Sequence, residues 1–137
     1  MPRILAIDYG LKRTGLAVTD PLQLIASPLT TVPTGTLMDF LKDYISKEEV
    51  VLFVIGMPKR LDSTPSQTAM NVKGFIKALQ REIPQIEVKE IDERFTSVMA
   101  MDAMIAGGMS KKDRRDKGNV DKISAAIILQ SYMESRR

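Results

Sequence analysis

The sequence has 137 residues and a formal net charge of +3 at neutral pH, with 44% hydrophobic and 27% charged residues. This balance is typical of a globular protein and excludes a disordered chain, and the length favours a single domain over residues 1–137. Cysteine and histidine are both missing. Disulfides and thiolate or imidazole metal sites are therefore excluded, which leaves acid, base and metal chemistry to carboxylates, Lys, Tyr or bound water.

The first third of the chain is dominated by strand patterns. Residues 3–7 form a short apolar run that ends at Asp8. A continuous apolar run of this length is typical of a strand buried on both faces. A turn then leads to residues 14–19, which we expect to form a hairpin with the first strand, and a short third strand is expected over residues 29–32. Apolar residues at three-and-four spacing predict an amphipathic helix over residues 37–45.

The remaining elements alternate between strands and helices. Residues 50–55 form a β-branched apolar run that predicts a second buried strand, and residues 86–91 alternate in the manner of a more exposed strand. Helices are expected over residues 66–81, from residue 96 or 97 to the glycine pair 107–108, and over residues 119–134. This order predicts an α/β fold with a mixed five-stranded sheet flanked by helices.

The apolar runs of the sequence predict neither a signal peptide nor a membrane span. The N-terminal apolar run reaches the charged Asp8 after only four residues, which is too short for the hydrophobic region of a signal peptide. The longest apolar run, residues 50–55, is far shorter than a membrane span. We therefore expect a cytoplasmic protein.

Carboxylates stand at the ends of two predicted strands. Asp8 follows the first strand, and Asp92 and Glu93 follow the strand over residues 86–91. The carboxyl ends of strands form the ligand-binding edge of an α/β sheet. Each group also has a simpler explanation, because Asp often begins a tight turn and solvated charges are common at strand ends.

A third carboxylate, Asp121, lies near the start of the last predicted helix. At 100° per residue it falls between Ile128 and Tyr132, on an apolar face where a carboxylate is costly unless it is paired or bound to a cation. The alternative is an acid in the first helical turn, stabilised by the helix dipole.

Two strand ends and one helix start can converge at one edge of a sheet, which would bring Asp8, Glu93 and Asp121 together. Carboxylate oxygens are suited to Mg²⁺ or Mn²⁺. Two such ions about 4 Å apart can activate water and stabilise the leaving oxygen of a phosphodiester, so no protein general base is needed. A chain without histidine could hydrolyse nucleic acid in this way.

Four segments in sequence order carry a resemblance to a known family. They are Ile7-Asp8-Tyr9-Gly10 followed by Lys12-Arg13-Thr14-Gly15, then Val54-Ile55-Gly56-Met57-Pro58, then Asp92-Glu93-Arg94-Phe95-Thr96-Ser97, and last Val120-Asp121. With these segments the chain resembles the YqgF family, also called RuvX, of the ribonuclease H-like superfamily. The resemblance implies a ribonuclease H-like fold and a metal-dependent nuclease, with Asp8, Glu93 and Asp121 as its catalytic, metal-binding acids.

The resemblance also implies a substrate. Members of the family are assigned to processing the 5′ end of pre-16S ribosomal RNA, and older naming makes them Holliday junction resolvases. RNA is therefore favoured over branched DNA as the partner, although the sequence itself does not separate the two. A resolvase would need to be a homodimer to cut two strands symmetrically, whereas an RNA-trimming enzyme could act as a monomer.

Basic residues flank the predicted acidic site. Lys12 and Arg13 follow Asp8 in the turn, and Arg94 follows Glu93. The charged loop before Asp121 contributes four further candidates for nucleic-acid binding: Lys111, Lys112, Arg114 and Arg115. Such a run is often only a solvated loop, but its place beside Asp121 favours contacts with the phosphate backbone.

Two other classes of protein share part of this pattern. The start of the chain, through Asp8, Gly10 and Gly15, resembles the phosphate loop of the actin, sugar kinase and Hsp70 ATPases, but those proteins enclose ATP between two lobes and this chain has room for one. A nucleic-acid-binding module could keep the fold without cutting. The presence of all three acids favours a nuclease over such a module.

Overall fold

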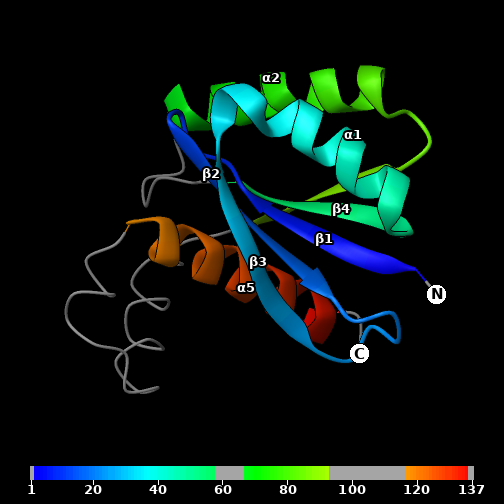
Figure 1. Cartoon of the computed structure of the whole chain (residues 1–137). Helices are drawn as coiled ribbons and strands as arrows, with labels where there is room; N and C mark the ends of the chain where they lie inside the picture. Colours follow the sequence, from blue (N-terminus) through cyan, green and yellow to red (C-terminus); the bar gives the residue numbers. More distant parts are fainter. Residues whose placement is uncertain (1, 58–66, 93–116, 136–137) are drawn as a thin grey trace.

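A mixed five-stranded sheet lies at the centre of the structure (Figure 1). The computed structural model describes residues 2–57, 67–92 and 117–135. The strands are β1 (Arg3–Asp8), β2 (Arg13–Thr19), β3 (Ala26–Pro33), β4 (Val50–Met57) and β5 (Glu87–Asp92), in the order β3-β2-β1-β4-β5. Strands β1, β2 and β3 are antiparallel neighbours, whereas β1, β4 and β5 run parallel. The predicted α/β class with a mixed five-stranded sheet is confirmed.

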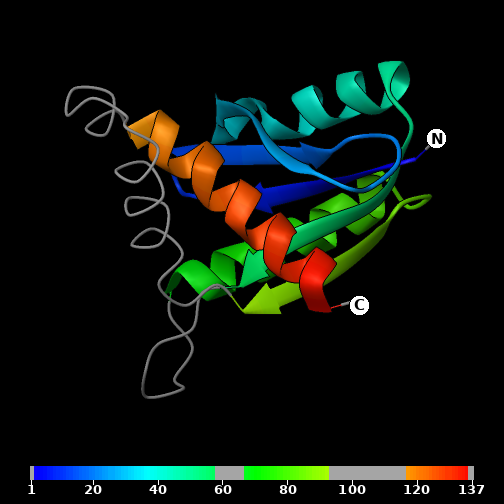
Figure 2. The ribbon, with the colours of Figure 1, turned by 90° about the horizontal axis from the view of Figure 1, so that it is seen from below.

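Helices cover both faces of the sheet. The short 3-10 helix η1 (Thr34–Thr36) leads into α1 (Leu37–Lys47), which lies with α2 (Gln67–Glu82) on one face. Of the helices in the described residues, α5 (Lys117–Ser135) is the one that crosses the other face (Figure 2). None of the described helices is long and apolar enough to span a membrane.

Strand β1 separates two hydrophobic cores. Leu5 and Ile7 pack into the core beneath α1 and α2, while Ile4 and Ala6 pack against α5. All four are essentially inaccessible to solvent, which confirms that this apolar run is a strand buried on both faces. Because each large side chain buried in this way stabilises the fold by about 1.5–3 kcal/mol, the two cores fix the positions of the carboxyl ends of the strands.

The observed elements differ from the predicted ones mainly at their ends. Strand β3 begins at Ala26 and ends at Pro33, so it is longer than the predicted residues 29–32. It is an edge strand with mostly half-exposed or exposed residues, and its sequence therefore lacks the apolar alternation that marks a strand. Helix α5 extends beyond the predicted residues 119–134 at both ends. The helix predicted between residues 96 and 108 lies outside the described residues.

Asp20 stabilises the turn between β2 and β3. Its Oδ1 accepts hydrogen bonds from the backbone N–H groups of Leu24 and Ile25, both at 2.8 Å. The bond from Ile25 is the main reason that the pKa of Asp20 lies below its ordinary value of 3.8. A lowered pKa in the folded state means that the ionised carboxylate stabilises the fold above that ordinary value and loses this effect as the pH falls.

We therefore expect Asp20→Ala to lower the melting temperature at pH 7 and to have less effect near pH 2. The reason is that the carboxylate of the unsubstituted protein is protonated at the lower pH and accepts these hydrogen bonds weakly. Circular dichroism melting curves of both proteins from pH 2 to pH 7 would measure the difference. An equal effect of the substitution at all pH values would contradict the assigned role of the carboxylate.

Candidate active site

The end of β1 and the first turns of α5 meet at Gly15 of β2. Gly15 is the residue opposite Asp8 in the antiparallel pairing of β1 and β2. On its other side it lies against the backbone of α5, where a methyl group on Gly15 would overlap the carbonyl group of Asp121 and come within 2.7 Å of the backbone nitrogen of Lys122. Asp8 and Asp121 therefore border the same glycine, although they are far apart in the sequence.

Asp8 lies on the face of the sheet that α5 covers. Successive residues of a strand point to opposite faces, and Ile4 and Ala6, at alternate positions before Asp8, pack against Ala125 and Ile128 of α5. Asp8 continues this row. The structure thus brings together two of the three predicted acids on one face of the sheet.

Asp92 lies on the opposite face. Ile91 packs with the core on the α5 side, whereas Asp92 is in register with Met57, whose side chain belongs to the core beneath α1 and α2. Alternation therefore separates Asp92 from the row that contains Asp8. Glu93, the acid that the sequence favours over Asp92, lies outside the described residues.

Arg13 forms an ion pair with Asp121 through its Nε and the Oδ2 of the carboxylate. The side chains are 38% and 21% exposed, so both are partly shielded from water. Arg13 precedes Gly15 by two positions on β2, which puts it on the α5 face. The sequence indicates that Asp121 is costly on this face unless it is paired or bound to a cation, with a helix-dipole role as the alternative. It does not identify Arg13 as the partner, because the pairing depends on how α5 packs across β2.

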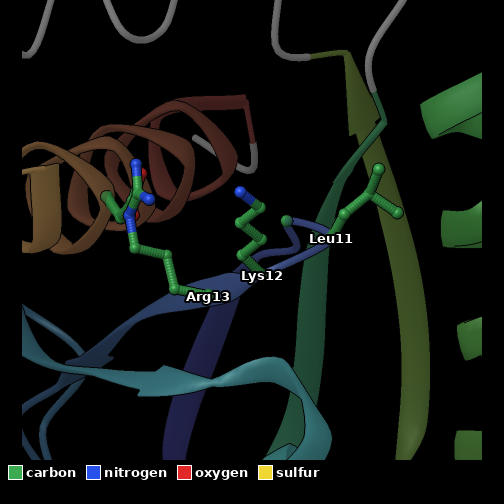
Figure 3. Close-up of a pocket in the computed structure, with 5 residues that line it drawn as sticks. Leu11, Lys12 and Arg13 are labelled. Carbon is green, nitrogen blue, oxygen red and sulfur yellow. The ribbon is translucent and has the colours of Figure 1, made fainter.

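A cavity of about 370 Å³ opens beside this pair and is lined by Gly10, Leu11, Lys12, Arg13 and Asp121. Figure 3 shows Lys12 and Arg13 extending from the turn on the side of α5, while Leu11 points away from them. Lys12 is exposed to solvent. The cavity therefore combines one carboxylate with two basic side chains, an arrangement that can accept a phosphate group next to a bound cation.

The structure describes only part of the predicted site. It describes Asp8, Asp121, Lys12 and Arg13, and it places the last three around one cavity. The other predicted site residues lie outside the described ranges: Glu93, Arg94, Lys111, Lys112, Arg114 and Arg115. Within residues 2–57, 67–92 and 117–135, no three acidic residues gather in a metal-binding cluster.

The fold is that of ribonuclease H-like proteins. The structure is similar to RuvC of Thermus thermophilus in complex with a Holliday junction substrate, with a TM-score of 0.59 and 16% identity over 99% of this chain and 96% of that chain. A second structure of the same RuvC gives a TM-score of 0.57 and 14% identity, covering 98% of this chain and 95% of that chain. At such low identity these similarities establish the fold alone.

Sequence relatives define the family. A family model described as "RuvX: Holliday junction resolvase" matches residues 2–135, and the chain belongs to this family. Proteins of Flavobacterium johnsoniae and Phocaeicola vulgatus are 54% and 55% identical to it over 137 residues, which cover all of this chain and 99% of each relative. Both relatives carry the name "Putative pre-16S rRNA nuclease". The resemblance to the YqgF or RuvX family is thus confirmed.

Proposed function

We propose that this protein is a metal-dependent nuclease that hydrolyses phosphodiester bonds and processes the 5′ end of pre-16S rRNA. The observation that carries the proposal is the meeting of Asp8 and Asp121 on either side of Gly15, beside a cavity lined with basic residues. Family membership and the names of the relatives support the nuclease activity and the RNA substrate.

The residues at this edge of the sheet fit a divalent cation. Asp121 is a partly shielded carboxylate that is paired with a cationic group, Arg13, so its position already favours a positive charge. The chain offers carboxylates and no histidine or cysteine, a donor chemistry that favours Mg²⁺ or Mn²⁺ over Zn²⁺. We propose Asp8, Asp121 and Glu93 as the ligands of two ions, with Glu93 assigned from the family motif.

The acidic and the basic residues of the site then have different roles. When bound, the two ions would supply an activated water and stabilise the leaving oxygen of the phosphodiester. Asp8 and Asp121 would hold the cations, while Lys12 would bind and orient the phosphate that enters the cavity. Arg94, Lys111, Lys112, Arg114 and Arg115 are proposed to contact the phosphate backbone. Contacts of this kind position a strand but do not read its sequence.

A second candidate substrate is a four-way DNA junction. It is favoured by the description of the matching family model and by the fold shared with RuvC, whose structure contains a Holliday junction substrate. Two substrates tested side by side would separate the alternatives: a fragment containing the 5′ end of pre-16S rRNA and a four-way DNA junction, each with Mg²⁺ or Mn²⁺. We expect metal-dependent cleavage of the RNA. Cleavage of the junction alone would contradict the proposed substrate.

We expect Lys12→Ala to weaken RNA binding without base preference and to reduce the slope of log K against log salt by about 1, because one phosphate contact is lost. Fluorescence anisotropy at several salt concentrations, on two unrelated RNA sequences, would measure both effects. Lys77→Ala is a matched control, since Lys77 is an exposed lysine on α2, which covers the opposite face of the sheet. Equal slopes for the two variants would contradict the role given to Lys12.

A further inference from the structure

Two threonine hydroxyl groups hold the turn that follows Asp8. The Oγ1 of Thr34, at the start of η1, donates a hydrogen bond of 2.6 Å to the carbonyl oxygen of Gly10. The backbone N–H of Thr34 donates to the carbonyl oxygen of Lys12 at 3.0 Å. The Oγ1 of Thr14 lies 2.9 Å from that of Thr34, and the N–H of Gly10 makes a longer bond of 3.5 Å to Thr14. Thr34 thus reaches two carbonyl groups of one turn.

These bonds have a single consistent direction. A hydroxyl group donates one hydrogen and can accept others. Since Thr34 donates to Gly10, the hydrogen between the two hydroxyl groups must come from Thr14, and Thr14 then accepts the N–H of Gly10. The N–H and carbonyl groups of Gly10 and the hydroxyl groups of the two threonines therefore form a closed ring. Bonds in such a ring polarise and strengthen one another.

The ring joins the two sides of the sheet, because Gly10 lines the cavity whereas the side chain of Thr14 lies on the opposite face. Thr14 is fully buried, and its neighbours in β2 alternate so that Arg13 and Gly15 face α5 while Leu16 belongs to the core beneath α1 and α2. Thr14 shares the face of Leu16. The hydroxyl group of Thr14 therefore does not line the cavity, and it can influence the site only through the backbone of the turn.

We propose that Thr34, acting with Thr14, is a positioning residue that sets the placement of Asp8 and Lys12 through the backbone of Gly10 and Lys12. This inference rests on the proposed nuclease function. The turn is tight, because a methyl group on Gly10 would overlap the carbonyl group of Arg13, and Asp8 lies only two residues before the tethered peptide. A displacement of about 1 Å at a catalytic group can cost a hundredfold in rate.

The test compares a hydroxyl-deleting with a hydroxyl-retaining substitution at Thr34. We expect Thr34→Val to lower kcat for the RNA fragment at least tenfold and Thr34→Ser to stay within threefold of the unsubstituted protein. Amide hydrogen exchange of residues 9–13 should become faster in Thr34→Val only. Thr14→Val and Thr14→Ser form a second pair with the same expectation, in case the Val variant at Thr34 does not fold.

Thr19→Val is a matched control for stability. Thr19 is a buried threonine at the other end of β2, and its Oγ1 accepts the N–H of Ile4 on β1 at 2.9 Å. This variant should lower the melting temperature and leave kcat within twofold. Equal activity of the Val and Ser variants, or a loss of kcat in Thr19→Val as large as in Thr34→Val, would overturn the inference.

Asp8→Asn separates this inference from the proposed function. If Asp8→Asn still cleaves RNA, the proposed site is wrong, and so is the positioning role of Thr34. If Asp8→Asn is inactive while Thr34→Val cleaves as fast as the unsubstituted protein, the proposed site is supported and only the positioning role of Thr34 is wrong.

Discussion

Cleavage of the RNA fragment by Asp8→Asn is expected to be slower by about a thousandfold or more, with binding of the same RNA changed less than threefold. Asn keeps the size of the side chain but removes the charge that holds a divalent ion. Loss of three orders of magnitude corresponds to roughly 4 kcal/mol of transition-state stabilisation. Binding is largely preserved because it depends on basic groups around the cavity rather than on the acids.

Single-turnover cleavage and fluorescence anisotropy would measure the two effects, and Asp92→Asn is the matched control. Asp92 stands at the same edge of the sheet on the opposite face from Asp8, so its substitution should leave cleavage within about threefold. A non-catalytic binding module would show no metal-dependent cleavage with or without Asp8. Loss of activity in Asp92→Asn but not in Asp8→Asn would reverse our assignment of the two acids.

The sequence predicted well the features that depend on local periodicity. The apolar run before Asp8 predicted a fully buried strand, and β1 buries residues on both faces. The helical angle of Asp121 placed it between Ile128 and Tyr132, and both of those residues are buried in the core beneath α5. Such predictions succeed because the period of each element is fixed by its backbone geometry.

Features that depend on tertiary packing could not be predicted in this way. The pairing of Arg13 with Asp121 and the hydroxyl ring of Thr14 and Thr34 each join residues that are distant in the sequence. Neither Arg13 nor Thr34 has a local pattern that indicates its partner. Gly15 belongs to the motif that carries the family resemblance, but the reason for a glycine there lies in the packing of α5 against it.

Gly15→Ala is expected to be strongly destabilising and to reduce cleavage at least a hundredfold. The added methyl group would collide with the backbone of Asp121 and Lys122, and no side-chain rotation can relieve a collision with backbone atoms. Ordinary carbon contacts need about 3.5–4.0 Å, so α5 must move away from β2. Overpacking of this kind costs about 1–3 kcal/mol, or roughly 3–12 °C in Tm for a chain of this size.

The loss of activity should exceed what unfolding explains, because the same movement carries Asp121 away from Asp8. Thermal melts and single-turnover cleavage well below the Tm would separate the two effects. Gly74→Ala is the control: Gly74 lies within α2, a methyl group there meets nothing within 4 Å, and alanine in a helix is favoured over glycine by about 0.5–1 kcal/mol. This variant should be at least as stable as the unsubstituted protein and fully active. A Gly15→Ala protein with normal cleavage would show that the close approach of α5 to β2 does not place Asp121.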